Sequence, residues 1–368
     1  MGSTWSDSRC WWVALHLIPG LGNIAGKKLL ERFGTPKGIF DAKRSELISV
    51  EGVRKGVAGK IANQEWESDP EKVLEIVIKN GARPIPYGDP AYPALLTEIH
   101  DPPFLLYVKG QDIPSGLTMV GVVGSRNPTP YGSKAARELA QGLARRGAGV
   151  VSGMARGIDA AAHWGCLEGL GFTVAVMGTG IDIIYPASNK KLFERIAQKG
   201  AIVSEFPPGT PPEPKNFPIR NRIISGMARG VLVVEATKKS GSLITASSAL
   251  NQGRDVFAVP GSINSFKSTG CHFLIKQGAA LVENADDIMD QLGLNYPHVP
   301  KKDRFKDEPP GPTEELEKRI YDLISDYPLQ IDHIARLGKL DPAQVSSVLT
   351  KMELKGMIRQ LPGKMFVR

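Results

Sequence analysis

The sequence predicts an α/β protein: a Rossmann-like, doubly wound, mostly parallel sheet, preceded by an N-terminal helical domain and followed by a C-terminal winged helix. The first observation behind this prediction is a series of seven short apolar runs that begins at Met119 and alternates with amphipathic stretches. Parallel strands are covered by helices on both faces, so they read as unbroken apolar runs. The second observation is a proline-rich, charged segment at 295–312 that cannot bury enough apolar surface to fold alone and is typical of a linker.

These features divide the 368 residues into four parts. We expect a helical domain of the helix-hairpin-helix or SAM-like type at 1–80, the Rossmann-like core at 81–294, the linker at 295–312 and the winged helix at 313–368. A chain of this length can hold two or three separate hydrophobic cores.

Two glycine-bearing turns characterise the N-terminal part, at Ile18–Gly22 and Val50–Arg54, and each precedes an apolar-periodic helix. This is the layout of paired helix-hairpin-helix units, whose turn amides can meet a DNA phosphate at a helix N-terminus. Arg54 stands where a second glycine would be expected in the second turn, which favours a module that packs or contacts protein. Both alternatives stay open at this point.

The core is predicted to contain seven strands with helices between them. Each helix ends at or near glycine, as helix C-termini prefer. The strands are expected at 119–124, 148–153, 173–178, 201–206, 230–236, 255–261 and 279–284, and the helices at 133–147, 157–169, 189–200, 241–253 and 271–278. In a doubly wound sheet the ligand crevice lies beyond the carboxyl ends of the strands, so function is expected in the loops that follow them.

Three helices and a hairpin are predicted after the linker. The helices span Glu314–Ser325, Gln330–Gly338 and Asp341–Gly356, the last with Asp341 as N-cap, and the hairpin turns at 362–363. Three helices followed by a hairpin make a winged helix.

The charge balance favours a polyanionic partner. The chain carries 46 basic against 38 acidic residues, and 119–292 alone carries 19 against 13. The three cysteines form no CxxC pair, and no apolar run approaches the length of a membrane span, so we expect a cytoplasmic protein. His163 and Cys166 lie one helical turn apart, but two ligands do not make a metal site, and core packing is the preferred interpretation.

Two strand-end loops have the composition of phosphate sites. After the first strand, Gly124 allows a close backbone approach, and Ser125 and Arg126 supply donors just before a helix. After the fifth strand, hydroxyls and amides stand at another helix start. These residues are Ser240, Gly241, Ser242 and Thr245. After the second strand, Gly153 permits a tight turn and is predicted to belong to the phosphate-binding residues. Asp159 in the following helix is expected to be a cap or a structural acceptor.

The segment 217–226, FPIRNRIISG, has the composition of a site for phosphate plus base. Arg220 and Arg222 carry planar guanidinium groups that match phosphate oxygens, and Phe217 offers a face on which an unpaired base can stack. Phe217 could instead belong to the core. Arg222 and Asn221 could instead be internal, with an arginine paired to a carboxylate such as Glu205 or Glu235.

No catalytic apparatus is visible in the sequence. There is neither a GxxxxGK[ST] loop nor a complete GxGxxG, and the nearest match, GTGIDI from Gly178, lacks the third glycine. We find no nucleophile with a plausible base and no carboxylate cluster for a divalent metal. The expectation is therefore no catalytic residue, no metal and no cofactor.

Seven motifs together resemble the DNA-processing protein family, DprA, also called Smf. They are GSRNPTPYG, SGMARGIDAAAH, GIDIIYPASN, SEFPPGTPP, FPIRNRIISG, VVEATKKSGSLITA and GRDVFAVPGS, in that order. The resemblance covers about Ile85 to Leu292, and the flanking parts also resemble that family. It implies a bacterial protein that binds single-stranded DNA, forms a homodimer and helps to load the RecA recombinase during natural transformation, without turnover.

The resemblance also implies a DNA pocket. In the family, the arginine of GSR and residues around FPxRNR line it; here these are Arg126, Lys215, Phe217, Arg220 and Arg222. His272 stands where family members usually carry asparagine, and it could replace the asparagine's hydrogen bond.

Two competing functions remain open. The first is an enzyme similar to nucleotide phosphoribohydrolases, which use a PGGxGT loop and a catalytic glutamate on a similar sheet; this chain has PGSINS from Pro260 instead. The second is a duplex-DNA regulator that works through the winged helix. Residues 313–368 carry 9 basic against 8 acidic side chains, which predicts weak phosphate attraction and makes a protein-contact role at least as plausible.

Overall fold

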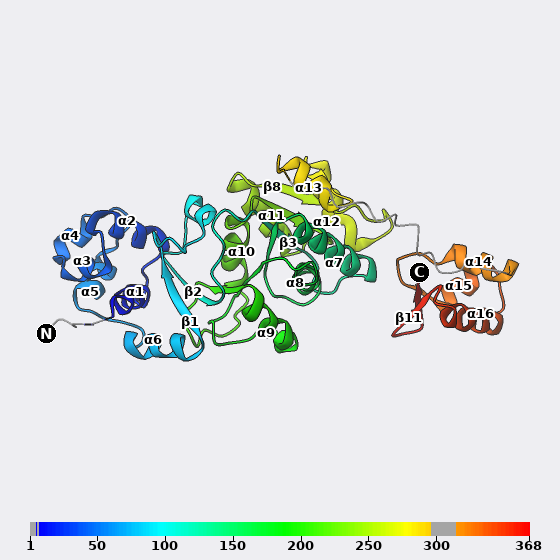
Figure 1. Ribbon diagram of the computed structural model, residues 1–368, viewed down its shortest axis with the longest axis horizontal. Coiled ribbons are helices and arrows are strands. Elements are labelled where there is room, and N and C mark those ends of the chain that lie inside the picture. Colours follow the sequence, from blue (N-terminus) through cyan, green and yellow to red (C-terminus); the bar gives the residue numbers. More distant parts are fainter. Residues whose placement is uncertain (1–4, 6, 296–313) are drawn as a thin grey trace. The chain divides into compact units, whose positions relative to one another are not determined.

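The computed structural model describes residues 5, 7–295 and 314–368. These residues form two compact units (Figure 1). The large unit holds the N-terminal helices and the main sheet, up to residue 127 and from 136 to 295; the small unit holds 314–368, with 128–135 grouped with it. No helix in these described ranges is long and apolar enough to cross a membrane.

Six helices form the N-terminal part of the large unit. They are α1 (Ser8–His16), α2 (Asn23–Phe33), α3 (Pro36–Asp41), α4 (Arg44–Ile48), α5 (Lys55–Ala62) and α6 (Pro70–Lys79). Both glycine turns are present, because Gly20 and Gly52 adopt φ values of +84° and +87°, which are open to glycine at no steric cost. Helices α2 and α5 start directly after these turns, as predicted.

Helix α2 packs against the sheet. Asn23 accepts a hydrogen bond from the Phe104 N–H at 3.4 Å and donates one to Glu205 at 3.5 Å. A Cβ atom on Gly26 would lie 2.6 Å from the Phe104 ring, so only glycine allows this approach. One face of the helix after the first glycine turn therefore packs on protein.

The main sheet has nine strands in the order β1-β2-β6-β5-β4-β3-β7-β8-β9. Its strands are β1 (Ala82–Pro86), β2 (Leu105–Gly110), β3 (Met119–Val123), β4 (Gly149–Ser152), β5 (Thr173–Val176), β6 (Ala201–Ser204), β7 (Gly230–Val233), β8 (Asp255–Ala258) and β9 (Ala280–Leu281). The seven strands from β3 onward coincide with the seven predicted ones and pair in parallel.

Two strands that were not predicted precede these seven. Strands β1 and β2 add an antiparallel edge next to β6. Pro84 and Pro86 lie within β1, and proline, which has no N–H to donate, argues against a strand unless it is at an edge. Strand β1 is the edge strand, so its prolines are tolerated there.

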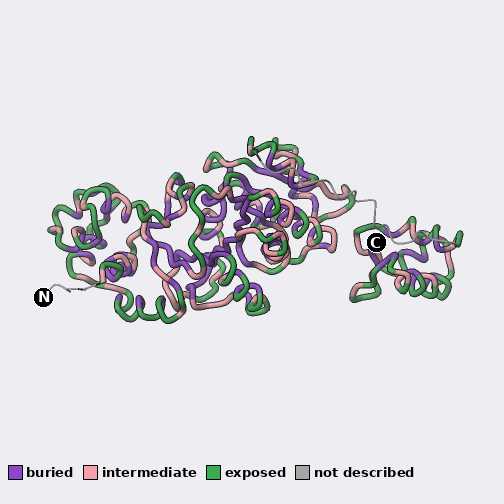
Figure 2. The backbone as a smooth tube through the Cα atoms, viewed as in Figure 1, coloured by how far each residue is buried: buried purple, intermediate pink, exposed green. Residues whose placement is uncertain are grey.

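Alternating residues of the strands belong to two separate hydrophobic clusters. Figure 2 shows the buried residues, in purple, gathered in the middle of the large unit. Ala175 and Ile202 belong to the core shared with the N-terminal helices and with α9. Their neighbours Val174, Val176 and Val203 belong to the other core, under α10 and α11. The helices after β3 are α7 (Pro130–Arg145), α8 (Ile158–Glu168), α9 (Lys190–Lys199), α10 (Asn216–Gly226), α11 (Ser242–Asn251), α12 (Thr269–Lys276) and α13 (Ala285–Gln291).

The strand order reverses at β3. From β3 the chain adds β4, β5 and β6 on one side, then crosses over to add β7, β8 and β9 on the other. Loops that leave β3 and β7 therefore diverge, and ligands of such sheets bind in the crevice at this point. The doubly wound, mostly parallel sheet is confirmed.

The small unit is a winged helix. Its elements are α14 (Glu315–Leu323), β10 (Leu329–Gln330), α15 (Ile331–Gly338), α16 (Pro342–Leu354), β11 (Arg359–Leu361) and β12 (Met365–Val367). Asp341 caps α16 by accepting from the Ala343 N–H at 2.9 Å, as predicted. The hairpin turns between β11 and β12 as expected, and β10, which was not predicted, pairs with β12.

The predicted linker at 295–312 lies, apart from Asn295, outside the described residues. The boundaries of the four predicted parts therefore stay predictions.

Candidate nucleic-acid interface

A cavity of about 490 Å³ lies at the carboxyl ends of the parallel strands of the large unit. Five strand-end loops contribute to it, those after β3, β4, β5, β6 and β7. Nine residues predicted for the site line it: Gly124, Arg126, Phe217, Arg220, Asn221, Ser240, Gly241, Ser242 and Thr245. The other four, Ser125, Gly153, Lys215 and Arg222, are not among its lining residues.

Arg220 is held firmly at the base of the cavity. Its side chain is buried, and its Nη1 atom donates to the carbonyl of Val176, at the end of β5, at 2.7 Å. Burial lowers the pKa of the guanidinium to about 10, and the nearby Asp159 carboxylate opposes this change. The Nε–H of Arg220 has no hydrogen-bond partner among the described residues. This Nε atom has almost no accessible surface, so what Arg220 brings to the cavity is a fixed, buried positive charge.

The position of Arg220 explains Gly153. A Cβ atom at Gly153 would lie 2.0 Å from Nη1 of Arg220, so only glycine leaves room for the guanidinium. Gly153 was predicted as part of a tight turn for phosphate. The structure instead shows it as the surface against which Arg220 packs.

Phe217 lies between backbone and cations rather than in the apolar core. A Cβ atom on Gly178 would lie 2.9 Å from its ring, so the ring touches bare backbone there. The guanidinium carbon of Arg126 is 5.2 Å from the ring centre, a cation–π distance. The Tyr185 ring is 5.7 Å away at an interplanar angle of 41°. Phe217 keeps part of its surface accessible in a cavity lined by two arginines.

The loop after β3 separates the roles of Ser125 and Arg126. Ser125 uses its backbone internally: its N–H donates to the Glu235 carbonyl at 2.7 Å, and its carbonyl accepts from the Ile158 N–H at 3.1 Å. A Cβ atom at Gly124 would lie 2.7 Å from the Ile158 side chain, so glycine is required at that position. These contacts fix the loop, and Arg126 is left exposed at the rim of the cavity.

The loop after β7 brings three hydroxyls to the cavity. Ser240 and Ser242 lie 2.8 Å apart through their Oγ atoms, and Thr245 follows one turn along α11. Gly241 is the N-cap of α11 and provides no side-chain cap. Hydroxyl donors at a helix N-terminus favour an anion there.

Asp159 also lines the cavity, next to both arginines. Its carboxylate is buried and accepts from the Ala155 N–H at 3.3 Å, which agrees with the predicted structural acceptor. Burial raises the pKa of Asp159, while the positive charges of Arg220 and Arg126 act to lower it.

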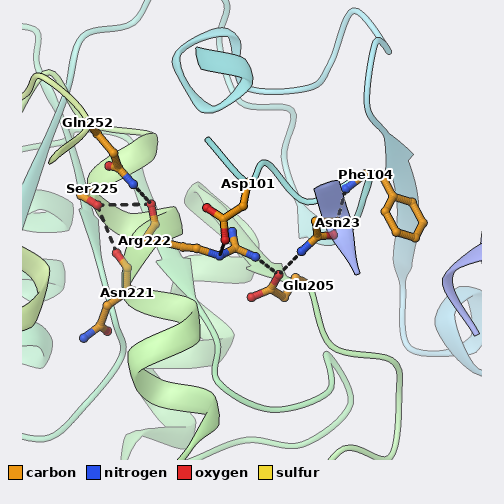
Figure 3. A network of polar contacts seen from close by, with 8 residues as sticks. All are labelled: Asn23, Asp101, Phe104, Glu205, Asn221, Arg222, Ser225 and Gln252. Atoms are coloured by element: carbon orange, nitrogen blue, oxygen red, sulfur yellow. Dashed lines mark hydrogen bonds and ion pairs between the residues drawn. The ribbon is translucent and has the colours of Figure 1, made fainter. Parts of the chain in front are cut away.

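Arg222 does not line the cavity and belongs to a separate polar network (Figure 3). Its Nε is 3.0 Å from the Asp101 carboxylate, and its Nη2 pairs with Glu205. The Arg222 side chain is 11% exposed and that of Glu205 is 8% exposed, so this ion pair is largely removed from water. Burial raises the pKa of Glu205, which the positive charge of Arg222 opposes. The structure therefore contains the alternative in which Arg222 is internal. Of the two carboxylates named from the sequence, Arg222 pairs with Glu205.

The remaining predicted residues lie as follows. Asn221 lines the cavity, and its side chain is directed away from Arg222 (Figure 3). Lys215 is exposed at the N-cap of α10 and pairs with Glu213 at 2.7 Å. His272 bonds through Nε2 to the Gly261 carbonyl at 3.0 Å.

Sequence reasoning missed Tyr185 and exposed cations at the strand-end loops. Tyr185 lies in the loop after β5 and lines the cavity beside Phe217. Arg156, Lys238 and Lys239 are exposed in the loops after β4 and β7. Their positions directly after predicted strands were the available signal. Within the described ranges, no group of three or more His, Cys, Asp or Glu side chains could hold a metal ion.

Comparison with known proteins gives a family match for both units. Residues 83–293 match the family model "DNA recombination-mediator protein A", and residues 306–364 match "DprA winged helix domain". Protein Smf of Synechocystis is 36% identical over 395 aligned residues, which cover 99% of each chain.

Two solved structures are similar as well. DNA processing protein A of Streptococcus pneumoniae has a TM-score of 0.69 and 36% identity, covering 81% of this chain and 100% of that one. DNA processing protein A of Helicobacter pylori has a TM-score of 0.52 and 30% identity, covering 59% of this chain and 97% of that one; its structure is described as giving insights into a unique single-stranded DNA binding mode. On this evidence, the chain belongs to the DprA/Smf family of DNA recombination-mediator proteins.

Proposed function

We propose that this protein binds single-stranded DNA in the cavity at the carboxyl ends of its parallel strands. The observation that carries the proposal is the stacking of exposed Arg126 on Phe217, with their charged and aromatic surfaces opening into one cavity. A binder that tolerates any sequence needs a basic track for phosphates and aromatic faces for bases, and this pair supplies both.

The cavity residues divide between backbone and base. Arg126 and the hydroxyls of Ser240, Ser242 and Thr245 are donors suited to phosphate oxygens, and Arg220 adds a buried positive charge beside them. Phe217 and Tyr185 are the aromatic surfaces for stacking. The Helicobacter pylori relative, described by its single-stranded DNA binding mode, supports this proposal.

A binding role without catalysis fits the lining residues. The carboxylate that lines the cavity, Asp159, is buried between two arginines, and the hydroxyls of Ser240 and Ser242 bond to each other. Neither arrangement supplies a general base beside a nucleophile, which a hydrolytic enzyme would need. This favours DNA binding over a phosphoribohydrolase-like enzyme.

The biological role follows from family membership. We propose that the protein acts in the cytoplasm as a homodimer that assists the loading of RecA recombinase on single-stranded DNA during natural transformation or recombination. The boundaries 1–80, 81–294 and 313–368 are proposed for its domains.

For the winged helix we propose a protein contact rather than duplex recognition. The exposed face of α16 presents Ser346, Ser347 and Thr350, which are uncharged. Lys351 of the same helix pairs with Glu314 at 2.6 Å and Glu317 at 3.2 Å. Such a helix offers little attraction to phosphates.

Fluorescence anisotropy with labelled oligothymidylate and a matched duplex, over a series of salt concentrations, tests the DNA proposal. The intact protein is expected to prefer the single strand. Arg126→Ala is expected to weaken binding and to reduce the slope of log K against log salt by about 0.7 for each phosphate that the arginine neutralises.

Arg195→Ala is the matched control, because it removes one exposed cation on α9 that does not line the cavity. It should leave affinity nearly unchanged. Absence of single-strand binding, or equal effects of the two substitutions, would refute the proposal.

A further inference from the structure

The loop between β8 and α12 presents an aromatic ring to solvent. Phe266, in the short helix η3 (Phe266–Ser268), is 74% exposed, the largest exposed fraction of any phenylalanine in the described ranges. A phenylalanine that packed onto the core would be buried. The same loop also contains Ile263, whose exposed fraction is 88%. An aromatic ring held in water at a functional edge is available to a partner.

The loop that carries Phe266 is hydrogen-bonded to two loops that line the cavity, the loop after β3 and the loop after β7. Lys267 donates from Nζ to the carbonyl of Asn127 at 2.5 Å, and Asn127 is the residue that follows Arg126. The Gly270 N–H donates to the Ala236 carbonyl at 2.7 Å, and a Cβ atom there would lie 2.7 Å from that oxygen. Thr269 closes the turn by donating from Oγ1 to the Phe266 carbonyl at 2.7 Å. The backbone that carries the ring is therefore held in place before any ligand arrives.

This loop continues the cavity along the edge of the sheet. Strands β3, β7 and β8 are direct neighbours, and neighbouring strands lie about 4.8 Å apart, so the ends of β3 and β8 are about 10 Å from each other. Exposed Lys238 and Lys239 stand in the loop of the strand between them. In the order of the strands β3, β7 and β8, this edge of the sheet therefore carries Arg126, then Lys238 and Lys239, and then Phe266 with Lys267.

We propose that Phe266 is a second stacking platform for single-stranded DNA; this inference rests on the proposed function. A DNA strand held in the cavity would reach Phe266 by running over the ends of β7 and β8. The loop repeats the chemistry of the cavity, an aromatic ring beside a cation. Bases beyond those held at Phe217 stack on Phe266, and Lys238, Lys239 and Lys267 compensate the phosphates between the two platforms. We therefore expect Phe266 to contribute to the affinity for long single-stranded DNA and not to the affinity for short oligonucleotides.

The test compares thymidine dinucleotide, which at about 3.4 Å per nucleotide is too short to run from the cavity to Phe266, with a long oligothymidylate of about 16 nucleotides. The full chain and Phe266→Ala are measured with both by fluorescence anisotropy. Phe266→Ala is expected to weaken the long strand by about 5-fold or more and to change the short strand by less than about 2-fold. Phe266→Trp should restore binding of the long strand, because indole also stacks.

Ile263→Ala is the matched control, since it removes an even more exposed apolar side chain from the same loop without removing a ring. It should not change either affinity. Equal affinities of Phe266→Ala and the intact protein for the long strand would overturn the inference, as would an equal loss with both strands.

Arg126→Ala separates this inference from the proposed function. If Arg126→Ala weakens both strands while Phe266→Ala weakens neither, only the second platform is refuted. If Arg126→Ala has no effect, the cavity proposal itself fails. Sedimentation equilibrium of Phe266→Ala tests whether the ring instead contacts a second copy of the chain. Loss of self-association with unchanged DNA affinity would assign the ring to a protein interface and overturn the inference.

Discussion

The guanidinium of Arg126 lies over the ring of Phe217, with 5.2 Å between its Cζ atom and the ring centre. The two residues come from the loop after β3 and from the start of α10, so the fold brings together a cation and an aromatic ring that are distant in the sequence. The contact orients both side chains at the cavity, where a phosphate and a base can be held side by side.

Replacing Phe217 is expected to weaken single-strand binding. Phe217→Leu keeps an apolar side chain against Gly178 but removes the aromatic face, so the loss should correspond to about 1–3 kcal/mol, the cost of one stacking platform. Anisotropy with oligothymidylate measures this loss, and thermal unfolding checks that the fold persists. Unchanged affinity in a folded variant would return Phe217 to a purely structural role.

Gly153→Ala is expected to disturb Arg220 directly. The new Cβ atom would lie 2.0 Å from Nη1 and would force the guanidinium away from the Val176 carbonyl, at a cost of about 1–3 kcal/mol in unfolding free energy. Single-strand affinity should fall as well, since Arg220 lines the cavity. Urea denaturation and anisotropy measure the two effects.

Gly56→Ala is the control for that substitution. Nothing lies within 4 Å of a Cβ atom there, and the residue is inside α5. It should be neutral or stabilising. A Gly153→Ala protein as stable and as active in binding as Gly56→Ala would contradict the packing described for Arg220.

Arg222→Ala should affect stability rather than the DNA contacts. Removing the arginine leaves the buried Glu205 without its partner, and breaking such a pair costs about 3–5 kcal/mol. Denaturant unfolding should show this loss. In protein that remains folded, the salt dependence of single-strand binding should match that of the intact chain, because Arg222 does not line the cavity. A reduced salt slope with normal stability would place Arg222 at the DNA instead.

Stability is expected to decrease in mild acid because of His16. This residue is half-buried and bonds to the Tyr107 hydroxyl at 3.0 Å, and desolvation of the ring lowers its pKa to about 4. The unfolded chain binds the proton near pH 6.5, so the stabilisation is complete above that pH and is lost as the pH falls to about 4. The lowered pKa corresponds to about 3 kcal/mol.

Urea denaturation at pH 7 and pH 4 measures that loss for the intact protein and for His16→Gln. The variant lacks the titrating ring and should lose about 3 kcal/mol less over the same interval. Buried His163, whose pKa is lowered to about 3, contributes in the same direction in both proteins. Equal losses would show that His16 does not titrate on unfolding.

Much of the fold was predictable because its signals are local. Continuous apolar runs and glycine-terminated helices identified all seven strands from β3 to β9, and Asp341 with Pro342 marked the start of α16. Strand β1 was missed because its prolines argue against a strand, and only its place at the edge of the sheet makes them tolerable. Tyr185 was missed because its relation to Phe217 exists only once β5 and α10 are placed.

The sequence by itself determined the parallel sheet, the edge at which its loops gather and the residue types of a phosphate and base site, since these follow from periodicity and from the parallel arrangement. Only the tertiary structure decided which side chains of 217–226 reach the cavity. Residues 220 and 222 are two positions apart on a helix and point to nearly opposite sides. Packing of α10 on the sheet turned Arg220 toward the cavity and Arg222 toward Glu205, and no local pattern encodes that choice.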